Sequence, residues 1–77
     1  MGPFPRISRN PLVMGGKPCL RGKRVTVSAI VGQIAEGGSI DDLLADYPYL
    51  EREDILEALR YAAWLASEHE IDLEHAS

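Results

Sequence analysis

The chain has 77 residues, of which 45% are hydrophobic and 26% charged, proportions typical of a soluble folded domain and not of a disordered chain. A domain of this length buries only a thin core, and the one cysteine, Cys19, cannot form an internal disulfide, so the composition favours support from a second subunit. No apolar run approaches the roughly 18 residues of a membrane span, and residues 1–9 lack a signal-peptide core, which predicts a cytoplasmic protein without a membrane partner.

The net charge of −4 conceals a strong division along the chain. Residues 1–35 carry six basic side chains and no acidic one (+6), whereas residues 36–77 carry twelve acidic and two basic side chains (−10). Such a division predicts two surfaces with different partners, or a head-to-tail electrostatic match between subunits.

The first 26 residues are expected to form turns and short strands, because four prolines between residues 3 and 18 make a helix implausible. Strands this short need another chain or the helices to pack on. The expected strands are residues 4–7, 18–20 and 24–26, with turns at Gly15-Gly16 and Arg21-Gly22.

Three helices follow, each marked by apolar residues at helical spacing. A third-helix stripe of Ile55, Ala58, Leu59, Ala62 and Ala66 is expected to face the core. The helices are expected to run from Val27, with Thr26 as N-cap, to a stop at Gly37; from Ile40, with Ser39 as N-cap, to Tyr47 before Pro48; and from about Arg52, with Glu51 as N-cap, to about His69. This predicts one domain over residues 1–77, made of a β and turn segment (1–26), a three-helix core (27–69) and a fraying tail (70–77).

Residues 15–24 give the strongest local signal, because four cations lie within eight residues among turn-forming glycines. A nucleotide-binding loop is excluded, since Lys17 is followed by proline and the glycine spacing is wrong. Contact with a nucleic-acid backbone, contact with an acidic protein and a merely solvated loop all remain open. The candidate DNA- or toxin-binding basic patch comprises Lys17, Arg21, Lys23 and Arg24, helped by Arg6 and Arg9.

The stretch from Arg9-Asn10-Pro11 through Gly15-Gly16-Lys17-Pro18-Cys19-Leu20-Arg21-Gly22-Lys23-Arg24-Val25-Thr26-Val27 resembles the N-terminal motif of the domain-of-unknown-function 433 family. The resemblance continues through Gly37-Gly38-Ser39-Ile40-Asp41-Asp42-Leu43-Leu44, Tyr47-Pro48-Tyr49-Leu50, Glu53-Asp54-Ile55 and Ala58-Leu59-Arg60-Tyr61-Ala62. The chain departs from the pattern at Asn10, where Asp is usual, at Lys23, where Thr is usual, and at Glu51, where Thr or Ser commonly caps the third helix.

The resemblance implies a mainly α fold, with a homeodomain-like three-helix (helix-turn-helix) core and a short N-terminal β element. It also implies a role as a VapB-like antitoxin of a type II toxin–antitoxin pair. Such an antitoxin acts as a homodimer, neutralises a PIN-like ribonuclease toxin and represses its own operon by binding operator DNA.

The charges of the third helix bear on that DNA-binding role. In a helix-turn-helix this helix enters the major groove by its first turn, which here reads Glu51-Arg52-Glu53-Asp54. Carboxylates there repel phosphates, so any DNA is expected to contact the basic patch instead. The same patch could cover the carboxylates of a PIN-like nuclease.

Two aromatic residues of the third helix, Tyr61 and Trp64, are candidate interface residues. On a helical wheel Trp64 lies on the charged side, with Glu57, Arg60 and Glu68, as interface hot-spot residues often do. The alternative is that the N-terminal strand or the tail of the same chain covers it.

No catalytic class is indicated, because no nucleophile lies beside a base and the carboxylates are expected on exposed helical faces. No cofactor or metal site is expected, and Cys19 is expected to be a small buried hydrophobe. The leading hypothesis is an antitoxin-like module that is not an enzyme. The alternatives are a stand-alone helix-turn-helix transcriptional regulator and a structural assembly subunit.

Overall fold

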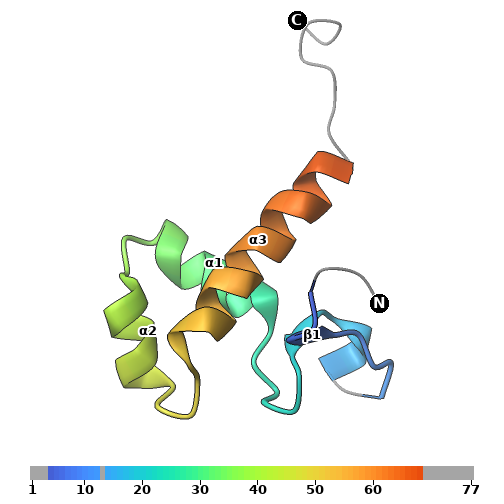
Figure 1. The fold of residues 1–77 in the computed structure, drawn as a ribbon, viewed down its shortest axis with the longest axis horizontal. Coiled ribbons are helices and arrows are strands. Elements are labelled where there is room, and N and C mark those ends of the chain that lie inside the picture. Colours follow the sequence, from blue (N-terminus) through green and yellow to red (C-terminus); the bar gives the residue numbers. More distant parts are fainter. Residues whose placement is uncertain (1–3, 13, 69–77) are drawn as a thin grey trace, which may run out of the picture.

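The computed structural model describes residues 4–12 and 14–68. The elements follow in the order β1 (Ile7–Ser8), η1 (Met14–Gly16), β2 (Cys19–Leu20), α1 (Val27–Ala35), α2 (Ile40–Asp46) and α3 (Arg52–Glu68). Figure 1 shows three helices with the small β element beside α3. The expected fold class, a mainly helical three-helix domain with a short N-terminal β element, is confirmed. The expected tail and His69 lie outside the described residues.

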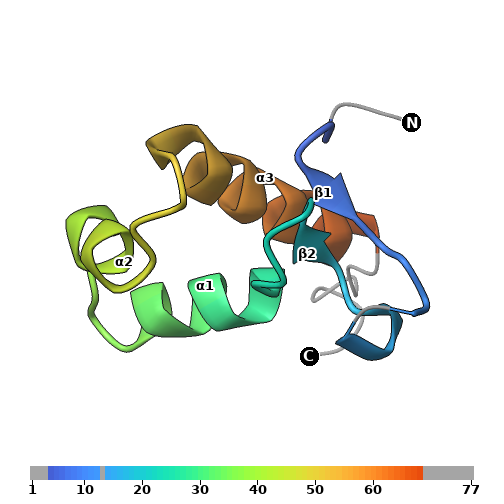
Figure 2. The same ribbon diagram turned by 90° about the horizontal axis from the view of Figure 1, so that it is seen from below.

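The helices α1 and α3 lie side by side, with α2 at one end of the pair and the β element at the other (Figure 2). The two strands are antiparallel, with Ile7 opposite Leu20 and Ser8 opposite Cys19. The N-terminal segment therefore packs near the middle of α3, while the last turns of α3 extend past the other elements (Figure 1).

The strands are shorter than the sequence predicts. Residues 4–6 form a turn, closed by the Ile7 N–H donating to the Phe4 carbonyl at 3.1 Å, so β1 begins only at Ile7. The predicted strand at residues 24–26 is reduced to one bridge between Thr26 and Cys19. The reason lies in Arg24, whose φ of 56° is outside the β region and interrupts the extended backbone.

The helix starts are confirmed by their caps. The Thr26 hydroxyl accepts the Ala29 N–H at 3.1 Å, as the N-cap of α1. Ser39 and Asp42 form a reciprocal capping box at the start of α2. Each cap satisfies a backbone N–H that the first helical turn leaves without a partner.

The turn between α1 and α2 depends on its two glycines. Gly37 has a φ of 99°, which only glycine adopts without strain, and it ends the first helix as the sequence predicts. At Gly38 a Cβ atom would lie 2.9 Å from the Gln33 carbonyl oxygen, so a side chain would push the two helices apart.

The core lies where the three helices and the β element meet. Its largest fully buried side chains are Leu20, Ile30, Leu43 and Ile55, one from each of four elements. The expected core stripe of α3 holds at Ile55 and Ala58, but Ala66 is exposed. None of the described helices is both long and apolar enough to cross a membrane.

Candidate partner-binding surface

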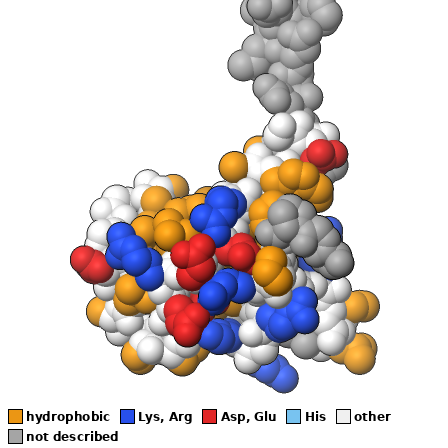
Figure 3. Space-filling view, in the orientation of Figure 1, with side chains coloured by type: hydrophobic (Ala, Val, Ile, Leu, Met, Phe, Trp, Pro, Cys, Tyr) orange, Lys and Arg blue, Asp and Glu red, His pale blue; other side chains and the backbone are white. Residues whose placement is uncertain are grey.

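An ion-pair network joins the N-terminal segment to the start of α3. We call it the clasp, and it comprises Arg6, Lys23, Glu51, Asp54 and Glu57. The Arg6 guanidinium contacts Glu51 at 2.8 Å and Asp54 at 2.9 Å, and the Lys23 ammonium contacts Asp54 at 3.2 Å. The Asp54 side chain is only 4% exposed, so it is the buried centre of the network. Figure 3 shows acidic (red) and basic (blue) side chains interleaved over the middle of one face.

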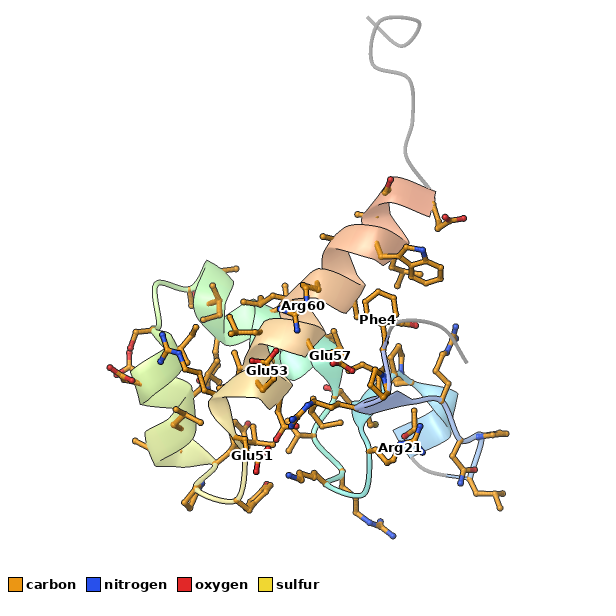
Figure 4. All side chains as sticks on the ribbon, viewed as in Figure 1. Phe4, Arg21, Glu51, Glu53, Glu57 and Arg60 are labelled. Atoms are coloured by element: carbon orange, nitrogen blue, oxygen red, sulfur yellow. The ribbon has the colours of Figure 1, made fainter. Side chains whose placement is uncertain are left out.

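Two further contacts complete the clasp. The Arg6 backbone N–H donates to Glu57, which is buried, and the Glu51 N–H donates to Asp54 at 2.8 Å. Asp54 thus caps its own helix while it binds both cations. Figure 4 shows Glu51, Glu53 and Glu57 following one another along the start of α3.

The surroundings of Asp54 lower the pKa of its carboxyl group. Burial raises the pKa of this carboxyl, but hydrogen bonds from the Glu51 N–H, Arg6 and Lys23 outweigh burial and hold the pKa below its ordinary value. The bonds from Glu51 and Asp54 raise the pKa of the Arg6 guanidinium. Asp54 and Arg6 are therefore both ionised at neutral pH.

The prediction that the carboxylates of α3 lie on exposed faces is wrong for Asp54 and Glu57, which are buried. Glu57 therefore does not share an exposed charged side with Trp64. The three-residue spacing from Glu51 to Asp54 is that of a capping box, so the bond from the Glu51 N–H to Asp54 could have been predicted from the sequence. The residues around Asp54 in the sequence do not indicate its distant partners, Arg6 and Lys23.

The structure splits the six predicted basic residues into two groups. Arg6 and Lys23 belong to the clasp, where they form ion pairs with Glu51 and Asp54. The other four are exposed, and none makes an ion pair with another described residue. We call these four the basic surface: Arg9, Lys17, Arg21 and Arg24.

The hairpin between β2 and α1 presents part of the basic surface. Gly22 has a φ of 72°, which suits the third position of a tight turn, and the Lys23 N–H donates to the Leu20 carbonyl at 3.0 Å. Arg21 and Arg24 flank a groove of about 410 Å³ that Ser8 and Asn10 also line. Arginine side chains beside polar groups suit an anionic partner.

The exposed cations of α3 differ from the basic surface, because each lies beside a carboxylate. Arg60 binds Glu53 at 2.8 Å, and Arg52 lies 3.8 Å from Asp41 (Figure 4 labels Glu53 and Arg60). That the first turn of α3 repels DNA stays a prediction; the exposed cations of α3 are each beside a carboxylate.

The aromatic pair lies against the N-terminal segment. Tyr61 is buried and meets the Phe4 ring edge-on, with centroids 5.2 Å apart. Trp64 packs on the same two rings at 5.6 and 5.7 Å, yet it stays 44% exposed. The N-terminal segment thus covers part of Trp64, and the remaining exposed part keeps its interface role as a prediction.

Two positions at which the chain departs from the family pattern meet in the clasp. Lys23 and Glu51 each supply a charge to it, through Asp54 and Arg6 respectively. The third departure, Asn10, accepts the Leu12 N–H at 2.9 Å in its own turn.

The other single residues of interest have structural roles. Cys19 is buried as expected, and its thiol donates to the Lys17 carbonyl at 3.3 Å. Within residues 4–12 and 14–68 there is no group of three or more His, Cys, Asp or Glu side chains suited to hold a metal ion.

Comparison with known proteins gives consistent results. The family model described as "Protein of unknown function (DUF433)" matches residues 7–62. The "Uncharacterized protein y4eO" of Sinorhizobium fredii (strain NBRC 101917 / NGR234) is 36% identical over 56 residues, which are 73% of this chain and 25% of that protein. The chain thus spans about a quarter of that relative's length. The crystal structure of a DUF433 member protein from Anabaena variabilis superposes with a TM-score of 0.73 at 33% identity, covering 94% of this chain and 69% of that one.

Proposed function

The chain belongs to the DUF433 family, whose description names no activity, and from its surface charges we propose that it is an antitoxin-like binding module and not an enzyme. In this proposal it belongs to a type II toxin–antitoxin pair in the cytoplasm. It binds and neutralises a PIN-like ribonuclease toxin through the basic surface.

One observation carries the proposal: the four cations of the basic surface are exposed and make no ion pair with another described residue, whereas Arg52 and Arg60 of α3 each lie beside a carboxylate. A surface that concentrates one sign of charge attracts a partner of the opposite sign and speeds their encounter. Nucleases of the PIN-like kind cluster carboxylates to hold metal ions. Arg21 and Arg24, beside the groove, are the residues best placed to cover such a cluster.

The test is co-purification with the nuclease encoded beside this chain. We expect Arg21→Ala combined with Arg24→Gly to lower the affinity at least about tenfold. The glycine is chosen because Arg24 has a φ of 56°, which glycine adopts without strain, so weaker binding cannot be ascribed to a strained hairpin. The matched control is Arg52→Ala, which removes an exposed cation from α3. Equal loss in the control, or full binding by the double variant, would contradict the proposal.

The alternative is a stand-alone DNA-binding transcriptional regulator, and autoregulation of the operon would use the same contacts. Four exposed cations also suit phosphate groups, which favours this alternative. A gel-shift titration with DNA from upstream of the gene separates the two. Tight binding that weakens steeply with salt, and that the double variant loses while nuclease binding persists, would favour the regulator.

A further inference from the structure

The last two turns of α3 have an unusual composition. Residues 61–67 read Tyr-Ala-Ala-Trp-Leu-Ala-Ser and carry no charged side chain, although Ala63, Trp64, Ala66 and Ser67 are all exposed. A surface helix normally has a polar side, and one that is uncharged all round is normally buried. This end of α3 therefore has the composition of an interior segment.

An apolar groove runs along the same segment, between α3 and α1. It has a volume of about 580 Å³. One wall is Ala62, Leu65 and Ala66 of α3; the other is Val27, Ser28 and Val31 of α1, with Tyr61 and the Lys17-Pro18 pair completing the lining. Lys17 is the one charged residue that lines it.

We infer that a second copy of this chain occupies the groove, so that the α1 and α3 pairs of two copies pack together about a two-fold axis. The end of α3 supplies both requirements of a self-complementary interface. It offers Leu65, a half-buried side chain in the groove wall, and, at Ala62 and Ala66, the small residues between which a knob can insert.

The charges around this face favour a second copy over a different protein. The groove lining carries a single charged side chain, Lys17. Two copies that meet at this face therefore bring little like charge together. A nearly uncharged apolar face is typical of homodimers, whereas a transient partner uses more polar surface, as the basic surface does here.

The inference does not depend on the proposed function, because the groove and the basic surface are different surfaces that have only Lys17 in common. Self-association is measured on the chain alone. A failure of nuclease binding thus leaves the dimer untouched, and a monomeric chain leaves the nuclease proposal open.

The experiment measures the mass of the full chain by light scattering after gel filtration. We expect wild type at twice the 8.5 kDa of one chain. Ser28→Glu and Ala66→Glu place a carboxylate on opposite walls of the groove, at exposed positions, and both should give the single-chain mass. Ser28→Glu adds an acidic residue to the first turn of α1, which favours that helix, so it separates dimer loss from unfolding.

The matched control is Ser67→Glu, which adds the same charge at an exposed position of α3 outside the groove lining and should keep the dimer mass. Circular dichroism reports whether each variant is folded. A monomeric wild type overturns the inference. So does a dimer that persists in folded Ser28→Glu and Ala66→Glu chains, or one that Ser67→Glu also abolishes, because the contact then lies elsewhere.

Discussion

The two ends of α3 are built on opposite plans. From Arg52 to Arg60 the helix is densely charged, and its buried carboxylates bind the N-terminal segment. From Tyr61 to Ser67 it has no charge, and much of it is exposed. Along this helix, charged side chains are buried at one end and apolar side chains are exposed at the other. The N-terminal segment of the same chain covers the charged end, whereas much of the apolar end is left exposed.

Replacing Asp54, the buried centre of the clasp, should have the largest effect on the stability of the folded chain. Asp54→Ala is expected to lower the free energy of unfolding by about 3 kcal/mol, because it removes a buried acceptor shared by Arg6, Lys23 and the Glu51 N–H. Urea unfolding followed by circular dichroism measures this. Glu53→Ala, one residue away but exposed, should cost less than about 0.5 kcal/mol. Equal losses in the two variants would refute a special role for Asp54.

Acid should loosen the same end without a mutation. The pKa of Asp54 is lower in the folded chain than its ordinary value of 3.8, so the unfolded chain takes up the proton first. The resulting stabilisation is fully present above pH 3.8 and is lost as the pH falls through the folded-state pKa. We expect the stability difference between wild type and Asp54→Asn to be largest near neutral pH and to shrink in acid. A constant difference would mean that the charge of Asp54 contributes nothing.

At the apolar end the expected effect on folding is smaller. Trp64→Ala should lower the free energy of unfolding by about 1 kcal/mol, since it removes the contacts of one ring with Phe4 and Tyr61. Because Trp64 is exposed but does not line the groove, the change should weaken the dimer less than Ala66→Glu does. A Trp64→Ala chain that is fully monomeric and otherwise stable would place the interface on Trp64 instead.

The helices could be predicted because their signals are local. Thr26 and Ser39 as caps, Gly37 as a stop and Arg52 as the first residue of α3 all follow from residues within a few positions. The strand lengths could not be predicted, because the left-handed backbone of Arg24 is rare for a residue other than glycine.

The candidate site could be predicted only as a set of charges. Arg21 and Arg24 stand out in sequence and are exposed, but Arg6 and Lys23 look the same in sequence and are bound to α3. Their roles depend on partners that only the folded chain brings within reach. Likewise, the apolar spacing that predicted a core position for Ala66 does not show that this residue is exposed near the end of α3.

The sequence distance that the clasp spans has a consequence for the lifetime of the folded chain. Arg6 contacts groups 45 to 51 positions further along, so its contacts close a long loop, and we expect them to form late in folding. Contacts that form after the rate-limiting step of folding act on the rate constant of unfolding. Arg6→Ala is therefore expected to unfold faster in stopped-flow experiments while it refolds at nearly the wild-type rate. On this prediction the clasp sets how long the folded chain stays closed.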